Sequence, residues 1–400
     1  MKITRRRVLG ASLVVPSLAG ANAKSSDSPV TVAPKDSWFD PWVEIHPENL
    51  RHNVEQIARR VESRPILAVI KNNGYGMGVA NVAQLLEPLS AIAGFAVVRM
   101  HEAMTLRDTG ISKPVLLMGS TEEKNLADCV ARRIMPMVYT PVGGAIDRVA
   151  AKSGQPIPIH VCLDTGLGRE GVPYQQAKPF VEDLAGRKSV EIQGIMTTFT
   201  EDQALDQEQV RRFRETCGAL EASGIKLGKK HTASSFTIFQ HPEAFLDMVR
   251  PGMAIYGIYS ENEFRHSGVM DLRPALSLKS RIVYVKQLRT GDNAGYDRAY
   301  TARSEVWVAT LPVGHADGWP RITVKGAKVL INGALCPVIA SSASHTIVEL
   351  GNDKRAEIGD IATCFGWEAG ARPEDVSEAC GASVYDLTMH LNPLLPRRIL

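Results

Sequence analysis

The chain has 400 residues, 44% of them hydrophobic, and a formal net charge of +3. This length is enough for two domains with large buried cores. Residues 1–23 contain four basic and no acidic residues, so the rest of the chain carries a formal charge of −1, and a near-neutral chain offers no electrostatic attraction for nucleic acid or an anionic membrane.

The first 23 residues have the composition of a signal peptide. A basic start is followed by an apolar run over 8–18 and by Ala-Asn-Ala at 21–23, an A-x-A cleavage pattern. The apolar run is too short to remain as a membrane anchor. Consecutive arginines at 5–7 resemble a twin-arginine signal, with a general secretory signal as the alternative. Either route predicts a protein exported to a bacterial periplasm.

The cysteines are scattered, without a C-x-x-C pair or a dense framework. We expect most of them to be buried thiols. An oxidising compartment would permit one disulfide, but the spacing does not identify a pair. The six are Cys129, Cys162, Cys217, Cys336, Cys364 and Cys380.

Residues 24–40 are polar and contain proline, which predicts a linker. From residue 41, "WVEIH" and a helical pattern begin a first domain, in which eight short apolar runs alternate with amphipathic segments up to residue 270. This alternation predicts a (β/α)8 TIM barrel over 41–270, with an open doubly wound sheet as the alternative. The eight runs are "PILAVI", "GFAVV", "PVLLMG", "MPMVYT", "PIPIHVCLD", "VEIQGIMTTF", "KKHTASSF" and "DMVRPGMAIYG".

The alternation of apolar runs and helical segments ends near residue 270, and residues 271–400 show a different pattern. Runs such as "LKSRIVYVKQL", "SEVWVATLP" and "HTIVELG" are joined by turns rich in glycine, asparagine and aspartate. They predict a β-rich C-terminal domain, which ends in a helix at "SVYDLTMHL".

A lysine ends the first apolar run of the barrel, in "AVIKNNGYGMG". Lys71 could be an ordinary solvated residue at a turn, or a desolvated amine kept for covalent chemistry. Barrel enzymes carry their chemistry at the carboxyl ends of the strands. Other runs end there with Arg169, Ser235, Arg250 and Gly252. A lysine opposite a small-residue phosphate cradle, with two arginines and no metal cluster, suggests pyridoxal phosphate held as a Schiff base.

Several segments, taken in order, resemble the alanine racemase family. They are "AVIKNNGYGMG", "HTASSF", "MVRPGMAIYG", "SLKSRIVYVKQLRTGDNAGYDRAY", "LPVGHADGWPR" and "LNPLLPRR". The resemblance covers about residues 41–400. It implies a pyridoxal 5'-phosphate-dependent amino-acid racemase that acts as a homodimer.

The resemblance implies two acid–base residues, because racemisation removes the α-proton on one face and returns a proton on the other. By position these are Lys71, also the Schiff-base lysine, and Tyr296 in "AGYDRAY", which would reach across from a partner subunit. Tyr300 is the alternative tyrosine in that segment. Tyrosine needs a neighbour to act as a base near neutral pH; Arg169 matches the family arginine that serves there and lines the substrate site.

The resemblance also implies the cofactor contacts. Arg250 would face the pyridine nitrogen and, since it cannot give up its proton, would leave that nitrogen unprotonated. The remaining cofactor-binding residues would be Lys71, Tyr75, Ser235, Gly252, Met253 and Tyr385.

Five positions depart from the family pattern. Cys162 stands where a lysine, often carbamylated, holds the arginine matched by Arg169, and Thr198 and His315 replace a histidine and a tyrosine. In the substrate-covering segment, Ala343 and Ser344 stand at the methionine and aspartate positions. Smaller residues with one negative charge fewer predict an altered or broad amino-acid specificity. The alternatives are a pyridoxal-phosphate aldolase, epimerase or lyase, or a catalytically weak amino-acid-binding relative; a lyase would not need a second α-proton base.

Overall fold

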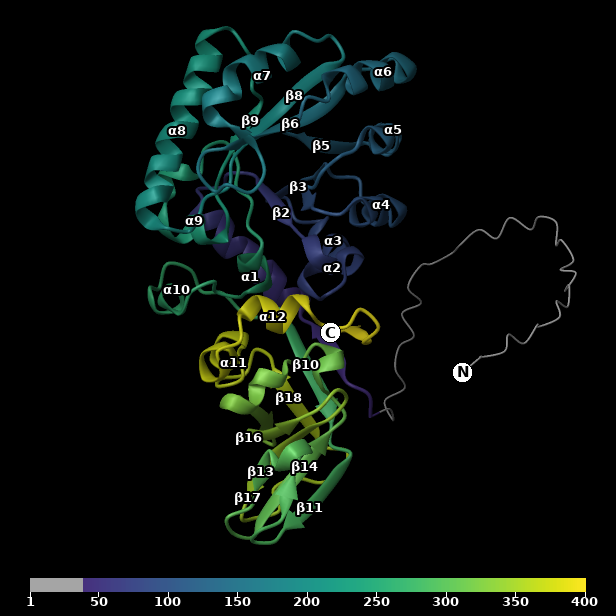
Figure 1. The fold of residues 1–400 in the computed structure, drawn as a ribbon, viewed down its shortest axis with the longest axis vertical. Helices are drawn as coiled ribbons and strands as arrows, with labels where there is room; N and C mark the ends of the chain where they lie inside the picture. The colour runs from purple at the N-terminus through teal and green to yellow at the C-terminus, as the bar shows by residue number, and fades with distance from the viewer. Residues whose placement is uncertain (1–38) are drawn as a thin grey trace, which may run out of the picture. The chain divides into compact units, whose positions relative to one another are not determined.

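The computed structural model describes residues 39–400, which fold into a barrel and a β-rich C-terminal part (Figure 1). The expected signal peptide and all but the last two residues of the expected linker lie outside the described residues. Within 39–400, no helix is long and apolar enough to cross a membrane. The six cysteines are buried and none forms a disulfide.

A parallel sheet forms the barrel wall. It runs in the order β2-β3-β4-β5-β6-β8-β9, and the two-residue strand β7 (Val172–Pro173) pairs with β6. Its strands are β2 (Ile66–Val69), β3 (Ile92–Val97), β4 (Val115–Leu117), β5 (Ile134–Val138), β6 (Ile157–Asp164), β8 (Val190–Met196) and β9 (Lys229–His231).

An eighth segment, residues 247–251, closes this sheet. On one side Val249 O accepts from Leu67 N at 2.9 Å, and on the other Arg250 N donates to Ala233 O at 2.8 Å. Val249 also forms a parallel bridge with Ile66. The barrel is therefore closed, as the eight apolar runs predict, and the open-sheet alternative is wrong.

Most of the barrel strands are largely apolar because both of their faces are covered, whereas β9 (KKH) and the first half of β8 carry polar, partly exposed residues. All four residues of β2, for example, are buried, and helices lie around the outside of the strands (Figure 1). The helices are α1 (Pro47–Arg60), α2 (Lys71–Tyr75), α3 (Val79–Leu86), α4 (Met100–Asp108), α5 (Glu123–Ala131), α6 (Gly143–Ser153), α7 (Ala177–Ala185), α8 (Gln203–Ala222), α9 (Ser235–Gln240) and α10 (Asn262–His266).

The C-terminal part is built on a nine-stranded sheet in the order β11-β14-β17-β16-β15-β18-β10-β1-β19. Two helices, α11 (Pro373–Cys380) and α12 (Val384–Met389), follow most of its strands, and a short hairpin pairs β12 (Asn293–Ala294) with β13 (Tyr300–Thr301). The nine strands are β1 (Trp42–Ile45), β10 (Leu276–Arg281), β11 (Tyr284–Leu288), β14 (Val306–Leu311), β15 (Lys328–Ile331), β16 (Ala334–Ser341), β17 (Thr346–Gly351), β18 (Ile361–Phe365) and β19 (Arg397–Ile399).

Strand β1 does not join the barrel sheet, although its sequence position placed it in the domain expected over 41–270. It pairs antiparallel with β10 and parallel with β19. All four of its residues are buried, so it needs a hydrogen-bonded neighbour on each side, and the closed barrel has no free edge to offer.

Candidate active site

Lys71 lies two residues after the last residue of β2, at the carboxyl end of a barrel strand. Burial lowers the pKa of its ammonium group, and the positive charge of Arg169 lowers it further, while Glu170, Glu102 and Glu201 act in the opposite direction. A lowered pKa increases the fraction of neutral, nucleophilic amine. Lys71 is therefore a partly desolvated amine and not an ordinary solvated lysine.

The chain after Lys71 makes one left-handed turn. Asn72, Asn73 and Gly74 have φ values of 54°, 56° and 61°, and Tyr75 follows with φ of 51°. Glycine and asparagine tolerate this conformation, whereas for most L-residues it costs roughly 1–2 kcal/mol each. Lys71 and Tyr75 are thus joined by a turn of the opposite hand to an α-helix.

The Tyr75 hydroxyl ends beside the backbone of Gly252, at the start of a 3₁₀ turn (Met253–Tyr256). A Cβ atom placed on Gly252 would lie 2.3 Å from Tyr75 Oη, so only glycine leaves room. Ser235 Oγ accepts from Gly252 N at 2.9 Å and from Ala254 N at 3.1 Å. Two hydroxyls, those of Tyr75 and Ser235, thus lie beside the backbone of Gly252, and hydroxyl and amide donors at such a turn can bind a phosphate.

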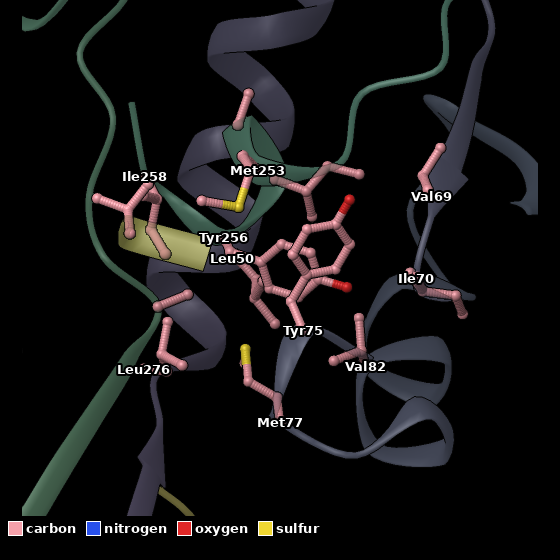
Figure 2. Packing of buried hydrophobic residues seen from close by; sticks show 14 of the residues in the cluster. Leu50, Val69, Ile70, Tyr75, Met77, Val82, Met253, Tyr256, Ile258 and Leu276 are labelled. Atoms are coloured by element: carbon pink, nitrogen blue, oxygen red, sulfur yellow. The ribbon is translucent and has the colours of Figure 1, made fainter. Parts of the chain in front are cut away.

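Packing fixes the Tyr75 ring from behind. Figure 2 shows it among Leu50, Met253 and Val82, and its centroid lies 4.6 Å from that of Tyr256. Because the ring is buried, the pKa of its hydroxyl is raised, and Tyr75 remains a hydrogen-bond donor.

Tyr385, on α12, is a second hydroxyl close to the first. Burial is the main cause of the raised pKa of Tyr75, and the nearby Tyr385 raises it further. Burial raises the pKa of Tyr385 itself to about 12, with smaller effects from Glu201 and Glu261. Both tyrosines are therefore protonated donors at neutral pH. The structure brings the phosphate residues predicted from the sequence into one region.

Arg250 lies at the end of the closing segment and is 5% exposed. Its Nη1 donates to His231 O at 2.5 Å and to His231 Nδ1 at 3.0 Å. Its Nη2 donates to Thr197 O at 2.8 Å and approaches Thr198 Oγ1 at 3.5 Å. Within residues 39–400, Arg250 Nε has no hydrogen-bond acceptor. This nitrogen is left to donate to a ligand.

Two buried histidines, which the sequence reasoning missed, support Arg250. His231 Nε2 lies 2.8 Å from His160 Nδ1. Burial, followed by the charge of Arg250, lowers the pKa of His160 to about 4 and that of His231 well below its usual value. Since arginine only donates, His231 must accept at Nδ1 and donate at Nε2 to His160. His160 and His231 lie in "PIPIHVCLD" and "KKHTASSF", two segments whose apolar pattern predicts a strand but does not indicate that the histidines meet.

Arg169 is held by a neighbouring carboxylate. Its Nη2 lies 3.3 Å from Glu170 Oε1, and its side chain is 57% exposed. Cys162, at the position of the family lysine, is buried, and burial raises the pKa of its thiol to about 12. A neutral thiol cannot pair with Arg169 as a carbamylated lysine would, and the ion-pair partner of Arg169 is instead the carboxylate of Glu170.

Tyr296 and Lys71 belong to different parts of the chain, Lys71 to the barrel and Tyr296 to the C-terminal part. It lies in a short 3₁₀ turn (Tyr296–Arg298) between β12 and β13, and 80% of its surface is exposed. Tyr300, by contrast, donates to Glu349 Oε2 at 2.8 Å, and burial together with this bond raises its pKa to about 12. Of the two tyrosines, Tyr296 is the one free to meet another surface.

Ala343 and Tyr296 both belong to the C-terminal part of the chain, Ala343 just after β16 and Tyr296 between β12 and β13. Its carbonyl accepts from Ala316 N at 2.9 Å, in a turn that directly follows β16. A Cβ atom on Gly295, next to Tyr296, would lie 2.6 Å from the Cβ atom of Ala340 near the end of β16. The exposed side chains of His315 and His345 also belong to this region and bond Arg321 (3.2 Å) and Ser344 (2.9 Å).

Comparison with known proteins gives the same assignment over both parts of the chain. Residues 45–260 match the model of the alanine racemase N-terminal domain, and 275–399 match that of the alanine racemase C-terminal domain. Alanine racemase of Desulforamulus reducens is 32% identical over 364 residues, covering 89% of this chain and 98% of that protein. That of Clostridium tetani is 31% identical over 366 residues, covering 89% and 94%.

Solved structures agree. Alanine racemase of Clostridium difficile 630 superposes with a TM-score of 0.84 at 29% identity, covering 90% of this chain and 95% of that one. Alanine racemase from D-cycloserine-producing Streptomyces lavendulae gives 0.84 at 27% identity, covering 91% and 98%. Members of this family depend on pyridoxal 5'-phosphate. The chain belongs to the alanine racemase family and is a pyridoxal-phosphate-dependent amino-acid racemase.

Proposed function

We propose that the enzyme exchanges the α-proton of its amino-acid substrate between two bases, Lys71 on one face and Tyr296 of a second copy of the chain on the other. One observation carries this: the chain holds a desolvated lysine at the barrel mouth but leaves Tyr296 80% exposed on another part of the molecule. A tyrosine so exposed can serve a site only when another surface meets it. Dimers are typical of the family.

The residues present fit the cofactor. Tyr75, Tyr385, Ser235 and the amides at Gly252 and Met253 would hold its phosphate, and Lys71 would hold it covalently. When bound, pyridoxal phosphate stabilises negative charge that develops at the substrate α-carbon. Glycine at 252 leaves the space that this cradle requires.

Arg250 would face the pyridine nitrogen through Nε. Its other two nitrogens are engaged by His231 and Thr197, so the guanidinium plane is fixed before any ligand arrives. A donor that keeps its proton leaves the pyridine nitrogen unprotonated. The cofactor is then a weaker electron sink, which favours return of the α-proton over transamination.

We propose that Lys71 and Tyr296 divide the proton transfer by face. Lys71 would take or return a proton at Nζ, and its lowered pKa suits an amine that acts near neutral pH. Tyr296 Oη would do so on the other side. Arg169, joined to Glu170 and close enough to Lys71 to affect its pKa, would place a positive charge near the substrate.

We propose that the substrate range extends beyond alanine, the amino acid in the names of the relatives. Ala343 and Ser344 are small side chains in the segment expected to cover the substrate. We also propose export to the periplasm, on the strength of the arginines at 5–7 and the pattern at 21–23.

The test is a screen of L- and D-amino acids in deuterium oxide, with α-proton exchange and optical rotation followed together. We expect exchange with inversion for alanine and for larger amino acids. Exchange without inversion would indicate a single base, and cleavage products would indicate an aldolase or lyase. Inversion of alanine alone would contradict the broad range while leaving the two-base mechanism in place.

A further inference from the structure

The left-handed turn that joins Lys71 to Tyr75 is held from two sides. On the barrel side, Asn73 N donates to Glu102 Oε1 at 2.9 Å, and this buried carboxylate also accepts from Arg99 N at 3.1 Å. On the other side the turn meets the end of the chain. A Cβ atom on Gly76 would lie 2.2 Å from Thr388 O, so the C-terminal segment packs directly on the backbone that leaves the turn.

Arg397 makes the polar connection on this second side. Its Nε and Nη2 both donate to Gly76 O, at 3.1 and 2.8 Å. Its Nη1 donates to Asn392 O at 2.8 Å, to Pro393 O at 2.9 Å and to Leu395 O at 2.5 Å. All three nitrogens of one guanidinium are therefore used on backbone carbonyls.

The charge of Arg397 has no acidic partner. Burial alone lowers its pKa, to about 10, and no carboxylate within residues 39–400 forms an ion pair with it. Its backbone is fixed separately, since β19 pairs with β1 in the register Val43 to Arg397. Arg397 is half-buried, and a cation withdrawn from water without a counter-charge is costly to keep. What Arg397 does is connect two parts of the structure: its side chain joins the C-terminal sheet to the carbonyl of Gly76, at the end of the Lys71 turn.

We propose that Arg397 is a positioning residue for cofactor binding. It holds the left-handed turn so that Lys71 and Tyr75 can contact the same cofactor molecule. Strained backbone persists only where its surroundings determine it. Without Arg397 the turn can relax, and Lys71 and Tyr75 no longer keep their relative placement. The inference rests on the proposed cofactor roles of these two residues.

The test compares Arg397→Met with Arg398→Met. Arg398 is the matched control, because it lies next in β19 but places its guanidinium 4.3 Å from the Trp42 ring centroid, away from the turn. Full-length protein is titrated with pyridoxal 5'-phosphate, followed by the visible absorbance of the Lys71-linked cofactor. We expect Arg397→Met to weaken cofactor binding by about tenfold or more, Arg397→Lys to recover part of the loss, and Arg398→Met to bind as the unchanged protein does.

Two results would overturn the inference: unchanged cofactor binding in Arg397→Met, whether or not its unfolding midpoint falls, or equal weakening of binding in Arg398→Met. If the unchanged protein shows no visible band that depends on Lys71, the proposed function itself fails, which is a different outcome. If Arg397→Met does not fold, hydrogen exchange on the unchanged protein decides. Coupling is reciprocal, so added cofactor must slow amide exchange over 388–400, and equal rates with and without it would refute the link.

Discussion

The hydroxyl of Tyr75 and the backbone of Gly252 occupy adjoining space, although 177 positions separate them in the sequence. A Cβ atom on residue 252 would lie 2.3 Å from Tyr75 Oη. The two residues belong to the carboxyl ends of neighbouring barrel strands, where closure by residues 247–251 brings the first strand beside the last segment. This proximity makes the proposed phosphate cradle sensitive to a single methyl group.

Gly252→Ala should therefore displace Tyr75 or the 3₁₀ turn. We expect affinity for pyridoxal phosphate to fall by about tenfold or more, and the free energy of unfolding to fall by roughly 1–3 kcal/mol. Gly218→Ala is the control, because Gly218 lies in α8 with no atom within 4 Å of the added Cβ position. That variant should bind cofactor normally and gain roughly 0.5–1 kcal/mol in stability. Equal cofactor affinity in both variants would show that residue 252 does not border the phosphate.

Tyr296→Phe should stop α-proton exchange for one enantiomer. Loss of a positioned general base or acid slows transfer by roughly 10²–10⁴-fold, while the visible band should persist because Lys71 and the phosphate residues are untouched. Exchange in deuterium oxide is measured separately for L- and D-substrate. Tyr300→Phe is the control: it removes the bond to Glu349 but should leave both exchange rates intact. Equal loss for both enantiomers in Tyr296→Phe would argue against division by face.

Mixing two inactive variants tests whether Tyr296 comes from a second copy. Lys71→Ala and Tyr296→Phe chains, each inactive alone, should form mixed dimers with one site that holds both residues and one that holds neither. Racemase activity should then return in the mixture. Subunit exchange is verified by mass spectrometry of the intact dimer. No recovery in a proven mixed dimer would place Lys71 and Tyr296 on one chain or remove Tyr296 from the mechanism.

The histidine pair behind Arg250 predicts a loss of stability in mild acid. Burial, and then the charge of Arg250, lowers the pKa of His160 from 6.5 to about 4, so between these values the unfolded chain binds a proton that the folded chain does not. The free energy of unfolding should therefore fall as the pH drops from about 6.5 to about 4, and His160 alone should account for about 3 kcal/mol of this decrease. His231 is shifted in the same direction and adds to the loss. His160→Gln keeps an acceptor for His231 without a titrating ring, and urea unfolding should show a shallower slope with pH; an unchanged slope would exclude His160 as its source.

Replacing the arginines at 5–7 by lysine should block export if the twin-arginine route is used. We expect uncleaved precursor to accumulate in the cytoplasm of an expressing bacterium, detected by fractionation and mass. Normal processing of the variant would instead indicate the general secretory route. A variant of the alanines at 21 and 23 tests the cleavage site independently of the route.

Much of this protein can be predicted from its sequence alone. The eight apolar runs define the barrel because a strand buried on both faces must be apolar throughout. Lys71, Ser235 and Arg250 are found at strand ends for the same reason, since charged or polar residues directly after an apolar run lie at the rim of the barrel. A lysine, a serine and an arginine gathered at that rim favour the binding of pyridoxal phosphate.

The tertiary structure alone decided three features. The partner of β1 depends on which sheet has a free edge, and the run "WVEI" reads the same for either sheet. The left-handed turn at Asn72 to Tyr75 donates a hydrogen bond to Glu102, and Gly76 directly after it accepts from Arg397; these partners lie 29 and more than 300 residues away. The hydrogen-bonded series from Arg250 through His231 to His160 requires the closing segment, β9 and β6 to come together. The periodicity of a sequence indicates which side chains are buried, but it does not indicate which distant groups those side chains contact.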